Sequence, residues 1–92
     1  MKIRYTRPAF RQLDAILAYV EARSPQGAGN LLDRIDGALA LVAEQPGIGR
    51  VTSRPGFRRI VLNPYPYAIL YRPSGVELVV HSIRHTSRRP RS

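Results

Sequence analysis

The chain has 92 residues, of which 15 are Lys or Arg and six are Asp or Glu, so its formal net charge is +9. That length supports one compact domain and is too short for two independent cores. The absence of cysteine excludes disulfides and Cys-based zinc sites, and no apolar run approaches the roughly 20 residues that a membrane-spanning helix needs.

The first predicted elements are a short strand and a helix. Residues 2–5 alternate between polar and apolar side chains, as a half-buried strand does. Thr6 is a typical N-cap and Pro8 falls in the first helical turn. The helix is expected to end near Arg23, because Ser24 precedes a proline and pre-proline residues avoid the α region. Its predicted apolar stripe consists of Phe10, Leu13, Ile16, Leu17 and Val20.

A second helix is predicted to follow with almost no connection. Ser24 is suited to be its N-cap and Pro25 its first-turn proline, and the Gln-Pro-Gly of residues 45–47 ends it. The two helices are expected to form an antiparallel hairpin whose apolar face covers one side of a sheet. The predicted stripe of the second helix consists of Leu31, Leu32, Ile35, Leu39 and Val42.

Three consecutive strands are predicted in the C-terminal half. Residues 57–62, 67–72 and 76–85 are rich in β-branched and aromatic side chains, and turns with proline or glycine separate them. These turns are too short for parallel crossovers, so the three strands are expected to form an antiparallel meander. Residues 48–56 are expected to be a loop. The predicted fold class is α+β, in the order β-α-α-β-β-β, with the helical hairpin on one face of an antiparallel sheet.

Positive charge is concentrated in the second half of the chain. Residues 1–49 hold six basic and five acidic residues, whereas residues 50–92 hold nine basic residues and one acid, Glu77. All the basic residues except Lys2 are arginine, which favours bidentate recognition of phosphate or carboxylate. Such a field attracts polyanions: nucleic acid, an acidic protein segment or an anionic membrane. Solubility alone would not confine the excess to one half.

No common catalytic constellation is present in the sequence. Metal-free RNA cleavage is the chemistry that stays open, because it needs a base, cations for the phosphate and an acid for the leaving oxygen. Arginines supply cations, and His81 and His85, predicted to share one strand face, offer an acid. Both histidines also fit structural roles. Three tyrosines that could stack bases are more typical of a core: Tyr65, Tyr67 and Tyr71.

Four short segments, in this order and at this spacing, carry a family resemblance. They are GIGR at 47–50, GFRR at 56–59, PYAILYR at 66–72 and IRHTSRRP at 83–90. Together with the predicted elements they resemble the RelE/ParE superfamily of type II toxins, and most of all the ParE branch. That branch often ends in a His-Gly-x-Arg-Asp-like segment. Here His85 and Arg88 match it, while Thr86 replaces the glycine and Arg89 the aspartate.

The resemblance implies a bacterial toxin encoded beside an antitoxin and linked to growth inhibition and plasmid stabilisation. The acidic and apolar segment of the antitoxin would wrap the toxin in a hetero-oligomer. ParE-like toxins stall DNA gyrase on DNA, whereas RelE-like toxins cut mRNA on the ribosome. The nuclease sites commonly use a C-terminal tyrosine or a Glu–His pair. This chain has no tyrosine after Arg72 and no glutamate in residues 50–57, which favours gyrase inhibition over ribosome-dependent endonuclease activity.

These patterns lead to residue assignments. Residues 1–85 are assigned to one toxin domain and residues 86–92 to a basic, mobile tail. No cofactor, metal or membrane is expected, and the location is expected to be the cytoplasm because the N-terminus lacks a signal-peptide h-region. If the chain is a nuclease, only Arg59, Arg84 and His85 remain to act.

Two surfaces are predicted for binding. The antitoxin is expected along the helical hairpin and onto the sheet, at Leu13, Leu17, Arg50, Tyr67 and Tyr71. The residues assigned to target binding are Arg58, Arg59, Arg72, Arg84, His85, Arg88 and Arg89.

Overall fold

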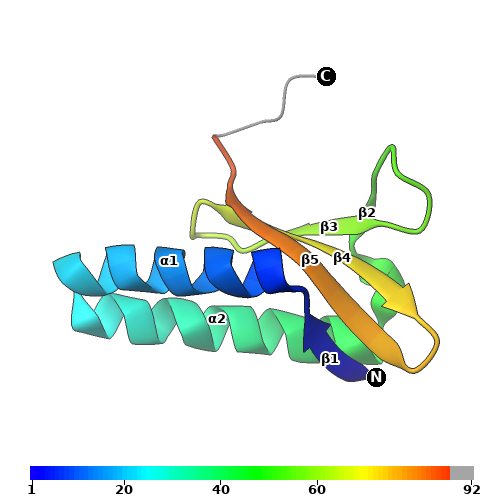
Figure 1. Cartoon of the computed structure of the whole chain (residues 1–92), viewed down its shortest axis with the longest axis horizontal. Coiled ribbons are helices and arrows are strands. Elements are labelled where there is room, and N and C mark those ends of the chain that lie inside the picture. Colours follow the sequence, from blue (N-terminus) through cyan, green and yellow to red (C-terminus); the bar gives the residue numbers. More distant parts are fainter. Residues whose placement is uncertain (88–92) are drawn as a thin grey trace.

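A computed structural model describes residues 1–87 and shows a helical hairpin packed against a five-stranded sheet (Figure 1). Helix α1 spans Arg7–Arg23 and helix α2 spans Pro25–Glu44. A short 3-10 turn, η1, covers Pro46–Ile48. The strands are β1 (Lys2–Tyr5), β2 (Arg50–Val51), β3 (Arg58–Val61), β4 (Tyr67–Ser74) and β5 (Glu77–His85).

Both helices begin where the sequence predicts, because their N-caps form. The Thr6 hydroxyl accepts a hydrogen bond from the Ala9 N–H at 3.2 Å, and the Ser24 hydroxyl accepts one from the Gly27 N–H at 2.9 Å. Each bond satisfies a backbone donor that the first helical turn leaves without an intrahelical partner. Ser24 also ends α1, so one residue closes the first helix and opens the second.

Two predicted members of the apolar stripes lie at the surface instead. The Phe10 side chain is 61% exposed and Leu32 is 36% exposed, whereas Ala9 is fully buried. The chain enters α1 directly from β1, and the Thr6 N–H donates to the Val80 carbonyl at 3.0 Å. That bond holds the first turn against β5, where the small Ala9 allows close approach and Phe10 is turned outward.

The sheet is mixed, which corrects the expectation of an all-antiparallel sheet. Its strand order is β1-β5-β4-β3-β2, and β1 pairs with β5 in parallel. The long path through both helices brings β5 back beside β1 in the same direction, as only a long crossover can. The meander of β3, β4 and β5 is antiparallel as predicted. Strand β2 lies within the predicted loop and pairs antiparallel with β3.

The two faces of the sheet are chemically unlike. On β4, the side chains of Tyr67, Ile69 and Tyr71 belong to the core beneath the helices. Because neighbouring side chains on a strand point to opposite faces, the residues between them point away from the helices, to a surface that we call the open face. Through the register of β3, β4 and β5, the open face carries Arg59, Ala68, Leu70, Arg72, Val79 and Arg84.

A β-bulge interrupts this alternation on β5. Leu70 pairs with Ser82, whereas the next residue of β4, Tyr71, pairs with Val80. His81 is therefore an extra residue on β5, and a bulge of this kind shifts the side chains that follow it to the other face. Within residues 1–87, neither helix is long and apolar enough to cross a membrane.

Candidate functional site

Arginines from several segments meet on the open face. The register places Arg50 of β2 opposite Arg59 of β3, and Arg72 and Arg84 extend the same face across β4 and β5. All four side chains are exposed. The face also holds Glu77, but that carboxylate pairs with Arg4 at 3.3 Å. Within residues 1–87, that is the one ion pair, so these four arginines have no carboxylate partner.

Phe57 lies beneath two arginines of this surface, Arg54 and Arg72. Its ring is 8% exposed, and the Arg54 guanidinium lies 3.9 Å from the ring centroid, while that of Arg72 lies at 5.7 Å. The His81 ring meets Phe57 edge-on, with the ring centroids 4.6 Å apart. Cation–π contacts of this kind order the arginine side chains over the ring. We call Arg50, Arg54, Arg59, Arg72 and Arg84 the open-face arginines.

His81 is held in its neutral form on this surface. Burial lowers the pKa of His81, and the positive charges of Arg72, Arg54 and Arg4 lower it further. Its Nε2 atom is buried and has no hydrogen-bond partner among the described residues. The sequence predicts that Phe57 lies in a strand, but not that its ring supports Arg54 and Arg72. That arrangement depends on contacts between a turn, β4 and β5, which no local pattern shows.

His85 lies on the opposite face, which corrects the prediction that the two histidines share one. Its ring packs edge-on against Tyr67, with centroids 5.4 Å apart, on the side of the helices. Its Nδ1 atom lies 2.7 Å from the Ser87 hydroxyl. The cause is the bulge, since His81 is itself the extra residue and reverses the strand alternation for the residues that follow it.

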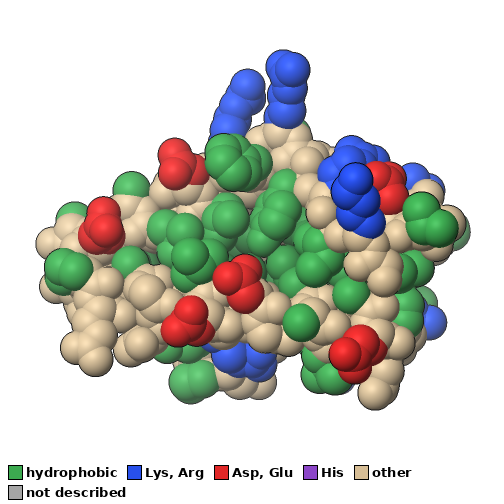
Figure 2. Space-filling model, turned by 90° about the horizontal axis from the view of Figure 1, so that it is seen from below, with side chains coloured by type: hydrophobic (Ala, Val, Ile, Leu, Met, Phe, Trp, Pro, Cys, Tyr) green, Lys and Arg blue, Asp and Glu red, His purple; other side chains and the backbone are tan. Residues whose placement is uncertain are grey.

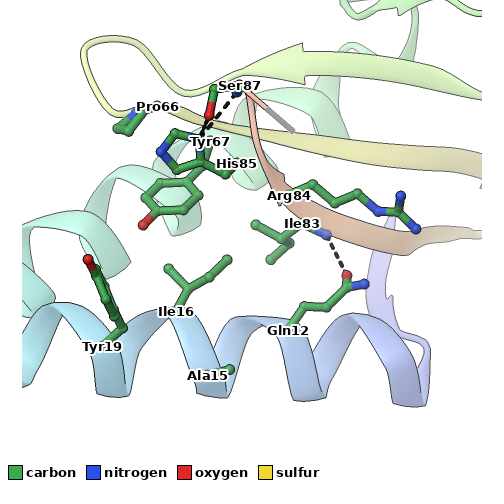
Figure 3. A pocket seen from close by; sticks show the side chains of 10 residues that line it. All are labelled: Gln12, Ala15, Ile16, Tyr19, Pro66, Tyr67, Ile83, Arg84, His85 and Ser87. Atoms are coloured by element: carbon green, nitrogen blue, oxygen red, sulfur yellow. Dashed lines mark hydrogen bonds between the residues drawn. The ribbon is translucent and has the colours of Figure 1, made fainter. Parts of the chain in front are cut away.

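His85 borders a groove between α1 and the end of β5 (Figure 3). The groove has a volume of about 810 Å³. Ile16, Tyr19 and Tyr67 project into it, and the Gln12 side chain closes one end by accepting a hydrogen bond from the Ile83 N–H at 2.8 Å. Tyr19 is 57% exposed, and its ring carries the Arg23 guanidinium at 3.7 Å. The groove thus combines apolar and aromatic walls with polar residues at its margins, among them Gln12, Arg84 and His85.

The helical side of the molecule differs from the open face in charge as well. All the acidic residues except Glu77 belong to α1 or α2: Asp14, Glu21, Asp33, Asp36 and Glu44. Figure 2 views the molecule from below, the side on which α2 lies in Figure 1. It shows acidic side chains interspersed with hydrophobic ones, while Lys and Arg lie mostly at the edges.

The three residues named for nuclease chemistry do not converge. Arg59 and Arg84 occupy open-face positions on strands separated by β4, whereas His85 faces the helices; the groove is bordered by both Arg84 and His85. The close-up shows the Arg84 side chain extending away from His85 (Figure 3). An acid and the cations that bind the phosphate must reach the same reacting group, and this arrangement separates them.

The predicted target-binding residues divide among three places. Arg72 lies on the open face with Arg59 and Arg84. Arg58 instead pairs with Tyr71 on the helical side, and its guanidinium donates to the carbonyls of Gly47 at 3.1 Å and Gly49 at 2.8 Å. Arg88 and Arg89 lie outside the described residues, as does most of the predicted tail.

The predicted antitoxin residues are also dispersed. Leu13, Tyr67 and Tyr71 are buried in the core, Leu17 is half-buried, and Arg50 lies at the far edge of the sheet. Of these, Tyr67 reaches the groove. Gln12 and Tyr19 flank the groove from α1 but are not predicted from the sequence, because the side of α1 that borders β5 is known only once the helix is docked.

A helical hairpin on a mixed sheet, with a groove beside α1 and an arginine surface on the open face, defines a small α+β protein with two chemically distinct surfaces. Comparison with known proteins gives the family. The model of the "ParE toxin of type II toxin-antitoxin system, parDE" matches residues 3–90. The chain therefore belongs to the ParE family of type II toxins, which confirms the resemblance drawn from the sequence and implies a cognate antitoxin.

Individual relatives agree with this family. A Sinorhizobium fredii protein named "Putative toxin Y4kP" is 41% identical over 73 residues, which cover 79% of this chain and 76% of the relative. The solved structure of a chromosomal ParDE system from P. aeruginosa superposes with a TM-score of 0.78 and 26% identity, covering 92% of this chain and 95% of that one. The isolated E. coli RelE toxin shares the fold, with a TM-score of 0.70, 17% identity and coverage of 96% and 86%.

Proposed function

We propose that this protein is a toxin that inhibits DNA gyrase by binding and that its antitoxin neutralises it. The observation that carries the proposal is that Arg59 and Arg84 lie at register positions of the open face, whereas His85 faces the helices beside Tyr67. A toxin that stalls another enzyme needs binding surfaces and no proton transfer of its own. Membership of the ParE family supports the same target, because the ParE branch is the one that resemblance links to gyrase.

The antitoxin is expected in the groove between α1 and β5. Tyr19 and Ile16 give it exposed aromatic and apolar walls, and Tyr67 gives it a floor. An apolar, amphipathic segment finds there the kind of anchor pocket that dominates protein–protein binding. Of the residues first assigned to this partner, Tyr67 remains in the proposed contact, whereas the buried Tyr71 serves the fold.

Two assays on the purified protein test the gyrase proposal against mRNA cleavage. The first measures DNA supercoiling by gyrase, and the second maps mRNA cleavage in a translating ribosome extract. We expect inhibition in the first and no toxin-dependent cleavage in the second. Cleaved mRNA together with unimpaired supercoiling would refute the proposal.

The His85→Ala variant sharpens the comparison. In a gyrase inhibitor, this substitution removes an edge contact with Tyr67 but no chemical step. We therefore expect the variant to inhibit supercoiling at most a few-fold more weakly than the parent protein. Circular dichroism first confirms that the variant is folded. In a nuclease that uses His85 as general acid, the same change would slow cleavage by roughly 10²–10⁴-fold.

A further inference from the structure

We propose that the open-face arginines bind the phosphate backbone of duplex DNA. The inference deepens the gyrase proposal, because a toxin that stalls gyrase meets the enzyme with DNA bound. It assigns the open face to DNA and leaves the helical side, with its groove, to protein partners. Three features of this face favour DNA: the spacing of its arginines, their lack of carboxylate partners within residues 1–87, and the lack of large exposed hydrophobic side chains.

The spacing of the arginines suits a phosphate backbone. Arg59 pairs with Leu70, and Arg84 pairs with Ala68, so Arg59, Arg72 and Arg84 lie on three adjacent strands. With a rise of about 3.3 Å per residue and about 4.8 Å between strands, their backbones are roughly 8–14 Å apart. Long arginine side chains can bridge that range to successive phosphates, and each guanidinium can bind phosphate oxygens bidentately.

The charges of this face are uncompensated in the free protein. Arg50 and Arg59 are directly opposite each other across β2 and β3. Like charges at such a position are destabilising, and within residues 1–87 no carboxylate pairs with either of them. An anionic ligand would relieve this repulsion and release the counterions that DNA carries.

The polarity of the face favours nucleic acid over an acidic protein segment. The large exposed hydrophobic side chains of residues 1–87 lie at the N-terminus, on the helices, on β1, on β2 or in turns, and none lies on the open face: Met1, Ile3, Phe10, Tyr19, Leu32, Leu41, Ile48, Val51 and Val76. Protein–protein interfaces need buried apolar or aromatic anchors. DNA binding draws its affinity from phosphate contacts, which this face can supply.

Two of the arginines are already ordered for such contacts. Arg54 and Arg72 lie over the buried ring of Phe57, and the His81 ring supports Phe57 from the strand. Stacking holds the guanidinium groups in place while leaving their edges open for hydrogen bonds. Less side-chain entropy is then lost on binding, which raises affinity without further contacts.

The test measures binding of the full-length protein to a short, mixed-sequence DNA duplex by fluorescence anisotropy, between about 50 and 200 mM salt. The test variant combines Arg59→Gln, Arg72→Gln and Arg84→Gln. The control variant combines Arg7→Gln, Arg11→Gln and Arg23→Gln, three exposed arginines of α1 that remove the same charge from the helical side. Circular dichroism confirms that both remain folded.

We expect the test variant to bind DNA at least tenfold more weakly at low salt, while the control keeps most of its affinity. The slope of log affinity against log salt is negative, and each lost phosphate contact makes it shallower by about 0.9. The test variant should therefore lose about 3 units of slope. Equal losses in both variants would overturn the inference, since only net charge would then matter. So would binding through this face to an RNA strand or a polyglutamate peptide with no binding to duplex DNA.

The supercoiling assay separates this inference from the function it builds on. DNA binding that depends on the open face, combined with unimpaired gyrase, would leave the inference standing and remove the gyrase proposal. Gyrase inhibition by a protein that does not bind duplex DNA would do the reverse.

Discussion

The Tyr71 hydroxyl accepts a hydrogen bond from the Gly49 N–H at 2.9 Å and donates one to the Pro46 carbonyl at 2.8 Å. Tyr71 is fully buried in β4, so its side chain crosses the core to hold the turn that follows α2. Burial raises the pKa of Tyr71, although the bond from Gly49 and the charge of Arg58 act in the opposite direction. These two hydrogen bonds fix the position of the turn that directly precedes β2. Strand β2 forms the edge of the sheet, so they also fix one edge of the open face.

Removing this hydroxyl should destabilise the protein. Tyr71→Phe leaves the Gly49 N–H and the Pro46 carbonyl without their partner, which costs about 1–3 kcal/mol when the groups stay buried. For a domain of this size, each kcal/mol lowers Tm by about 4–8 °C. Thermal denaturation measures the change. Tyr65→Phe is the control, because the Tyr65 hydroxyl makes no hydrogen bond within the described residues; an equal fall in both variants would contradict this account.

Gly49 is required for space. Its φ is −71°, which any residue adopts, but a Cβ there would overlap the Tyr71 hydroxyl and ring. Gly49→Ala should therefore cost about 1–3 kcal/mol, the range for overpacking a buried site. The matched control is Gly47→Ala, two residues earlier, where an added Cβ meets nothing within 4 Å. Denaturant unfolding measures the free energy of unfolding of both variants. Equal values would show that the turn can shift to accommodate a Cβ at position 49.

Stability should fall with acid because of His81. Its pKa is lowered in the fold, so between that lowered value and the ordinary value near 6.5 the unfolded chain binds more protons than the folded one. The contribution is fully present above about pH 6.5 and is lost as the pH falls through the folded pKa. We expect Tm to decrease from pH 7 toward pH 5, and His81→Phe to flatten that decrease. The control His85→Gln should retain it; a profile that is unchanged in His81→Phe would argue against the burial of this ring.

The groove should matter to the antitoxin more than other exposed apolar surface does. Tyr19→Ala removes an aromatic wall, and we expect the complex with the cognate antitoxin to weaken by about 2 kcal/mol, or roughly 30-fold. Leu41→Ala on α2 is the control, since Leu41 is 47% exposed and does not line the groove. Calorimetry measures both affinities, and equal weakening would place the antitoxin elsewhere.

The C-terminal arginines should be needed for toxicity but not for folding. Deleting residues 88–92 removes Arg88, Arg89 and Arg91 and leaves the Thr86 N–H bonded to the Pro66 carbonyl at 2.8 Å. We expect near-native circular dichroism and a loss of growth inhibition when the truncated protein is produced without antitoxin. A truncated protein of full toxicity would rule out this role for the tail.

The sequence by itself determined the two helices and the four longer strands, because their signals are local, but not the two-residue strand β2. The N-cap hydroxyls of Thr6 and Ser24 set the helix starts, and the turn at residues 63–66 and Gly75 set the meander. The turn predicted at 73–75 comes too early, because β4 continues through Pro73 and Ser74, which pair with β5. Charge counts also showed that the second half of the chain attracts anions. The order and spacing of four short motifs then sufficed to name the family, which the comparison confirmed.

Only the tertiary structure decided which side chains act together. A single extra residue at His81 places the two histidines on opposite faces, and no local pattern marks such a bulge, since it arises from pairing with β4. The parallel pairing of β1 with β5 depends on contacts between residues more than 70 positions apart. The same holds for the arginine surface around Phe57 and the groove beside Tyr19, because each is built from segments that meet only when the helices dock on the sheet.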